Sequence, residues 1–179
     1  MGYVFERRRR DGLLVCTLPE PYAELLKQIV RELAEMIAAP PPGEVTDRLF
    51  PRAYLDPTEE DAEQEWQSFV HDDLVRAKAD ALEGVLRDLN GARAAGREQV
   101  AIDLDEEGET RWLQVLNDAR LTLGTVLGVN EEARLDFPAD DPRAVRAAIY
   151  DVLTEMQNDL VEVLLAEQPE EGTADEPEY

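Results

Sequence analysis

Four stretches of this chain repeat apolar residues at steps of three and four, and this spacing constrains the fold more than any other feature. An α-helix turns once in about 3.6 residues, so such a repeat gathers its apolar side chains into one stripe. The clearest stretch is 22–37, and the others are 59–89, 107–127 and 142–164. The pattern predicts about four main helices that pack through their stripes.

The predicted helix starts carry residues that suit a helix N-terminus, namely Thr17, Thr58, Asp105 and Asp141. Their side-chain oxygens can accept hydrogen bonds from free backbone N–H groups of the first turn. A helix over 59–89 would be unusually long for a globular protein. This predicted helix could therefore break near His71.

Three short segments favour strands. Tyr3-Val4-Phe5 and Leu13–Leu18 flank a turn signal at Asp11-Gly12, which predicts a hairpin, and residues 99–104 alternate apolar with polar. We therefore expect an α+β fold, predominantly helical, with a small antiparallel sheet formed by the N-terminal hairpin and one internal strand. Residues 1–166 are predicted to form a single acidic domain and 167–179 a disordered acidic tail.

The charge balance restricts the classes of partner. Forty-one acidic residues against 18 Lys and Arg give a net charge of -23. Binding to nucleic acids and to anionic membranes depends on cationic side chains, so neither partner is expected to bind directly. Without a long apolar run or a signal-peptide core, the chain is predicted to be cytoplasmic.

The only basic cluster is Arg7, Arg8, Arg9 and Arg10, at the tip of the predicted hairpin. It could bind an anion or nucleic acid, as the wing of a winged-helix protein does. It could also be an exposed strand end whose charges prevent edge-to-edge pairing. We favour the second interpretation, with an acidic partner or the protein's own tail as the group that the arginines attract.

Cys16 is the only cysteine and lies on a predicted strand. A redox-sensing thiol has to be exposed and to have a low pKa. A cysteine on a buried strand more often behaves as a small hydrophobic side chain. Cys16 is therefore a redox candidate, and burial is the favoured alternative.

No catalytic or metal-binding motif is present in the sequence. The acids at 59–65 lack the Glu-x-x-His spacing of di-iron bundles, and Ser68 is the only serine. We predict a protein that is not an enzyme and has no cofactor and no metal, with a metal-dependent enzyme as the least favoured alternative.

Polar residues interrupt the apolar stretch 107–127. Asn117, Asp118 and Arg120 could form an internal network in which Arg120 pairs with an acid, or they could form a partner-binding face. The network is the favoured interpretation.

Three segments carry a family resemblance: Arg48-Leu49-Phe50-Pro51-Arg52-Ala53-Tyr54, the acidic run to Trp66, and 112–124, which reads WLQVLNDARLTLG. With the strand Phe5 to Arg8, they resemble an actinobacterial family of unknown function that is similar to the actinomycete oxidative-stress regulator. Arg48, Phe50 and Tyr54 are accordingly interaction candidates.

The resemblance implies a mixed, mainly helical regulatory protein. In the oxidative-stress branch it implies a thiol switch and transcriptional control through a sigma factor. An intramolecular switch needs two thiols and this chain has one, so the sequence departs from the family at that point unless Cys16 forms an intermolecular disulfide or a mixed adduct. We predict a non-catalytic regulator that contacts proteins, with transcription machinery as a candidate partner and homodimerisation as a further possibility. A direct DNA-binding regulator that uses Arg7–Arg10 is the alternative.

Overall fold

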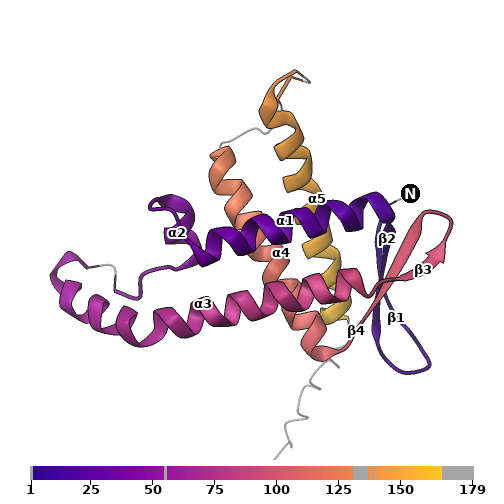
Figure 1. Ribbon diagram of the computed structural model, residues 1–179, viewed down its shortest axis with the longest axis horizontal. Coiled ribbons are helices and arrows are strands. Elements are labelled where there is room, and N and C mark those ends of the chain that lie inside the picture. The colour runs from indigo at the N-terminus through magenta and orange to yellow at the C-terminus, as the bar shows by residue number, and fades with distance from the viewer. Residues whose placement is uncertain (1, 55, 131–136, 139, 167–179) are drawn as a thin grey trace, which may run out of the picture.

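The computed structural model describes residues 2–54, 56–130, 137–138 and 140–166. Its helices are α1 (Glu20–Ala38), α2 (Glu44–Leu49), the short 3-10 helix η1 (Pro57–Glu59), α3 (Glu60–Asn90), α4 (Glu106–Leu127) and α5 (Pro142–Leu165). Its strands are β1 (Val4–Arg7), β2 (Leu14–Pro19), β3 (Arg93–Gly96) and β4 (Gln99–Leu104). The predicted α+β, mainly helical class is confirmed (Figure 1). The predicted tail at 167–179 lies outside the described residues.

The sheet has the strand order β1-β2-β4-β3, and all of its pairs are antiparallel. The prediction of a hairpin and one internal strand was incomplete, because β3 adds a fourth strand. The predicted tight turn at Asp11-Gly12 is also corrected. Arg8 N–H donates to Leu13 O over 2.9 Å, so Arg9 to Gly12 form a four-residue loop, and Gly12 takes a positive φ of 74° at its end.

Strand alternation gives the sheet two different faces. Cys16 lies opposite Phe5 and Ile102, and Leu14 lies opposite Leu104, so these residues share one face. All five belong to the hydrophobic core under the helices. The opposite face carries charged residues near the hairpin tip, among them Asp103 opposite Val15.

The start of α1 differs from the prediction. Thr17 does not cap the helix, because β2 continues to Pro19, which pairs with Gln99 of β4. Glu20 N–H then donates to Glu98 O over 3.0 Å. Pro19 occupies the N-cap position, so the strand runs into the helix directly.

α3 is a continuous helix of 31 residues, without the break considered near His71. At 1.5 Å per residue it is about 46 Å long. α1 packs along α3, and the first half of α3 extends with α2 on the side away from the sheet (Figure 1). Most of the buried residues of α3 lie after residue 77.

α4 and α5 pack against each other and complete the core. The predicted caps of both are present: Asp105 accepts from Gly108 N–H and Asp141 accepts from Arg143 N–H, both over 2.8 Å. The largest fully buried side chain is Trp112 of α4. In the described part of the chain, no helix combines the length and the apolar character that a bilayer span requires.

Candidate interaction site

Arg7 attaches the hairpin to the helical layer. It lies opposite Leu14 and so on the core side of the sheet, at its edge. Its guanidinium forms a two-point ion pair with Glu109 in the first turns of α4, with 3.1 Å between Nη2 and Oε2. It also donates to Gly12 O over 3.0 Å. The Glu109 side chain is only 9% exposed, so the Arg7 side chain takes part in a structural ion pair.

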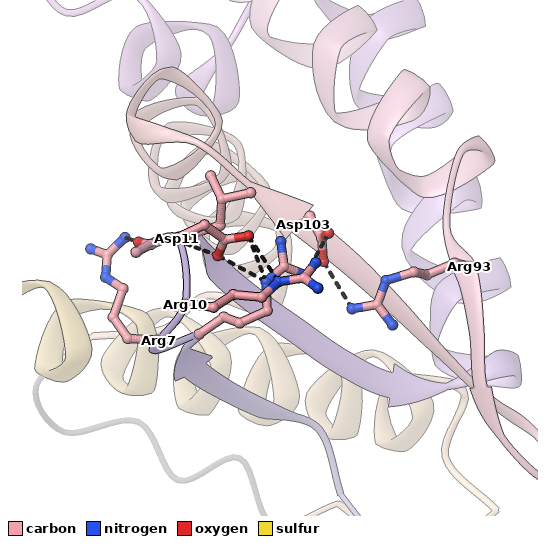
Figure 2. Close-up of polar contacts among 8 residues, drawn as sticks. Arg7, Arg10, Asp11, Arg93 and Asp103 are labelled. Atoms are coloured by element: carbon pink, nitrogen blue, oxygen red, sulfur yellow. Dashed lines mark hydrogen bonds and ion pairs between the residues drawn. The ribbon is translucent and has the colours of Figure 1, made fainter.

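Arg8 belongs to the opposite face and bridges two acids. Its Nε lies 2.9 Å from Asp11 Oδ1 and its Nη1 lies 2.7 Å from Asp103 Oδ2. Asp103 also accepts from Arg93 of β3 over 2.9 Å, which links strands on both sides of β2 (Figure 2). Hydrogen bonding from Arg8 lowers the pKa of Asp11 to about 2 and also lowers the pKa of Asp103.

The remaining two arginines are more exposed. Arg10 Nε contacts Asp11 over 3.2 Å, with its side chain 76% exposed. Arg9 is exposed and makes no hydrogen bond or ion pair with any residue of the described ranges. Figure 2 shows Arg7 directed away from the group around Asp103. Three of the four arginines are therefore ion-paired with acids, and the hairpin tip is not an unpaired cationic cluster.

Cys16 lies fully buried in the core face of the sheet. Burial raises the pKa of its thiol to about 12. At neutral pH the reactive thiolate is therefore a negligible fraction of the population. The arginines of the hairpin lie too far along the strand to provide the compensating charge, since Cys16 pairs with Phe5 rather than with the arginine end of β1.

The three polar residues of α4 do not form one network. Asp118 pairs with Lys78 of α3, with Oδ1 and Oδ2 at 2.9 and 2.7 Å from Nζ, and both side chains are more than 90% buried. Asn117 accepts from Gln157 of α5 over 3.3 Å. Arg120 has no ion pair within the described segments, and its buried Nε has no hydrogen-bond partner. The predicted pairing of Arg120 with an acid is therefore wrong.

Burial raises the pKa of Asp118, and the Lys78 ammonium opposes this shift. The pair joins α3 to α4 in the interior. Sequence reasoning identified Asp118 but not its partner, because Lys78 lies among charged residues of a helix that otherwise looks solvated.

The segment between α2 and α3 packs onto the body only in part. Phe50 is buried and its ring packs against His71 at a tilt of 50°, with ring centroids 5.3 Å apart, whereas Tyr54 is 37% exposed. Glu63 Oε2 accepts from the backbone N–H groups of Ala53 and Tyr54, over 3.0 and 2.8 Å. This acid therefore fixes the segment between α2 and α3.

Phe69 is the most exposed large apolar residue among the described positions, at 74%. Sequence reasoning placed it in the buried stripe of α3. The part of α3 that carries it has few buried residues, and no element of the described ranges covers this position. Glu65, Asp72 and Asp73 lie four before, three after and four after it, on the same side of the helix, and all are exposed. We call these four residues the Phe69 face.

The acids elsewhere are dispersed. Within the described segments, no group of three or more His, Cys, Asp or Glu side chains is close enough to hold a metal ion.

Comparisons with known proteins agree with the resemblance in the sequence. Oxidative stress regulator AosR of Mycobacterium tuberculosis and of Mycobacterium bovis is 29% identical over 138 residues, which cover 69% of this chain and 60% of that protein. AosR of Mycobacterium leprae is 32% identical over 100 residues, or 56% of this chain and 43% of that protein. The chain thus spans less than two thirds of these relatives. No solved structure matches it.

The family model described as a domain of unknown function, DUF2017, matches residues 4–164. This range runs from the first strand to the last turns of α5, so it includes every element described above. The protein belongs to the DUF2017 family.

Proposed function

We propose that this protein is a non-catalytic regulator that acts by binding another protein, in transcriptional control linked to oxidative stress. The names of its mycobacterial relatives support the regulatory role. Those relatives are longer than the aligned region, so the partner of this chain is inferred from its own surface rather than from theirs.

The observation that carries the proposal is the Phe69 face. An aromatic ring that is 74% exposed leaves apolar surface in water at a cost, and a partner would recover it. Interface hot spots are often aromatic residues surrounded by a polar rim. Here the rim is acidic, so the fitting partner has a basic surface with an apolar pocket.

Two further features support contact through proteins. The net charge of -23 opposes binding to a phosphate backbone, and acids elsewhere in the structure form ion pairs with Arg7, Arg8 and Arg10. The thiol of Cys16 is buried and protonated at neutral pH. We infer that an oxidative signal reaches this protein through its partner and not through its own thiol.

The test is a pull-down from cells with the tagged full chain, followed by rebinding of the captured protein after purification. Phe69→Ser should lower recovery and rebinding at least tenfold. Val145→Ser is the matched control, because Val145 is an apolar residue of α5 with 67% exposure, and it should leave both unchanged. Binding should weaken as salt is raised, since the rim charges are exposed.

Equal recovery by Phe69→Ser and Val145→Ser would refute the Phe69 face as the contact. Binding of the isolated protein to duplex DNA at low salt, fading steeply as salt is raised, would favour the DNA-binding alternative instead. Homodimerisation stays a prediction, which size-exclusion chromatography of both variants can examine.

A further inference from the structure

Two arginines share a small cavity on the side of the molecule where α2 meets α4 and α5. The cavity has a volume of about 80 Å³, and its lining includes Arg48 from the last turn of α2, Arg120 and Thr125 from α4, and Tyr150 from α5. Gly124 lies at its wall, where a Cβ atom would come within 3.1 Å of Tyr150 Cε2. Glycine at this position therefore lets the tyrosine ring approach the helix.

Neither arginine is neutralised by the described part of the chain. No ion pair or hydrogen bond is found there for the Arg48 or the Arg120 side chain, and the Nε of Arg120 is buried without an acceptor. Guanidinium groups stay protonated at all ordinary pH values, and both residues line the cavity, Arg48 as an exposed and Arg120 as a half-buried side chain. The buried N–H group of Arg120 without an acceptor raises the free energy of the empty site.

This arrangement is unusual in so acidic a chain. The sequence has 41 acids for 18 Lys and Arg, and other arginines with a partly buried position, such as Arg7 and Arg111, have an acidic partner. An acid could have been placed beside Arg120 with ease. The described residues that line the cavity instead include two arginines and no acid.

We propose that this cavity binds a compact oxyanion, a phosphate or carboxylate group, between Arg48 and Arg120. Guanidinium groups bind such oxyanions through paired N–H donors, and charge-assisted bonds of this kind are short and strong. A water molecule takes about 30 Å³ in the liquid, so the volume suits one such group and not a polymer backbone. The hydroxyl of Thr125 donates to Leu121 O over 2.8 Å, so the donors left among the lining side chains are the guanidinium groups and the Tyr150 hydroxyl.

The site is separate from the Phe69 face, because it lies on α2, α4 and α5 rather than on α3. Its test can therefore fail or succeed independently of the proposed partner contact.

The experiment follows the Nε–Hε resonance of Arg120 in the full ¹⁵N-labelled chain during titration with inorganic phosphate, and separately with acetate. Sodium chloride holds the ionic strength constant, so that only specific binding moves the signal. We expect a saturable shift with at least one of the two anions. Phosphate alone, acetate alone or both would identify the oxyanion chemistry that the site accepts.

Four variants make the assignment specific. Arg120→Gln should lower the affinity at least tenfold and Arg48→Gln severalfold, each measured by calorimetry. Arg97→Gln, which removes an exposed charge between β3 and β4, should leave it unchanged. Gly124→Ala should weaken binding without any change of charge, because the added methyl group would displace the Tyr150 ring.

A stability measurement separates this role from a structural one. Arg120→Gln removes no ion pair, so its urea midpoint without ligand should not fall, whereas the anion that binds in the titration should raise the midpoint of the wild type more than that of Arg120→Gln. The proposal is overturned if neither anion gives a saturable shift, if Arg120→Gln binds as well as Arg97→Gln, or if Arg120→Gln destabilises the unliganded protein.

Discussion

The interior ion pair between Lys78 and Asp118 provides a quantitative test of the packing of α3 on α4. The substitution to make is Asp118→Ala. It removes the acceptor of two hydrogen bonds, 2.9 and 2.7 Å long, and leaves the Lys78 ammonium in a position where its side chain is 9% exposed. A buried charge that loses its partner keeps the cost of its lost hydration.

The expected loss of stability is about 3–5 kcal/mol, the range measured when one partner of a buried pair is removed. A domain of this kind has about 5–15 kcal/mol in total, so the variant should lose a large share of it. The double variant Lys78→Met with Asp118→Leu removes both charges and fills similar space. It should be far less destabilised than Asp118→Ala, and close to the wild type.

The assay is urea unfolding at pH 7, followed by far-UV circular dichroism. Asp73→Ala is the matched control, because Asp73 pairs with Arg76 over 3.0 Å within the same helix but with both side chains about 70% exposed. Both substitutions put Ala for Asp inside a helix, so the gain in helix propensity is common to both. The control should change stability by about 0.5 kcal/mol or less.

Two results would refute this reasoning. If Asp118→Ala costs no more than Asp73→Ala, the pair is not buried as described. If the double variant is as unstable as the single one, the loss comes from packing and not from the unpaired charge.

Three further outcomes are expected. In Arg8→Gln, NMR titration should show the pKa of Asp11 rising from about 2 toward its unperturbed value of about 3.9. Because pairing with Arg8 lowers the pKa of Asp11 in the folded state, the contribution of this pair to stability is complete above pH ~4. That contribution is lost as the pH falls through about 2. Cys16 should react with a thiol reagent at pH 7 only as fast as the protein unfolds, and rapid labelling of the native chain would contradict its burial. Asp105→Ala should cost about 1 kcal/mol in urea unfolding, since it removes the acceptor for Gly108 N–H, and an unchanged midpoint would rule out the cap.

The helices could be predicted because their signals are local. Apolar spacing gives the buried stripe, and Asp105 and Asp141 mark the starts of α4 and α5 by the hydrogen bonds that they accept. The hairpin was predicted from the turn signal at Asp11-Gly12 between two strand-favouring segments, and β4 from the alternation of its apolar residues. The resemblance identified the family from short segments that happen to include the α2 region and most of α4.

The parts that could not be predicted depend on tertiary context. β3 has the sequence Arg-Ala-Ala-Gly, which favours no strand, and it forms because the free edge of β4 pairs with it across an irregular step between Ala94 and Gly96. Thr17 failed as a cap because pairing with β4 keeps its backbone extended. Phe69 fits the stripe of α3, yet its exposure depends on how far that helix extends beyond its neighbours.

The candidate site shows the same limit. Asn117, Asp118 and Arg120 are close in sequence, but each residue of a helix is turned by about 100° from the one before. Asp118 consequently contacts α3 and Asn117 contacts α5, whereas Arg120 lines a cavity and has no partner within the described residues. The cavity that brings Arg48 together with Arg120 joins residues 72 positions apart, and no pattern within either segment signals it.

The register of the sheet has a consequence for biosynthesis. β2 pairs with β4, so Leu14 can pair with Leu104 only after that residue has been synthesised. β1 likewise packs against α5, which is synthesised later still. During translation the first 19 residues therefore leave the ribosome long before their neighbours exist. The contact between the hairpin and α5 cannot form until that helix has emerged, and nascent chains stalled before α5 should expose the thiol of Cys16 to chaperones and to oxidants from which the finished fold protects it.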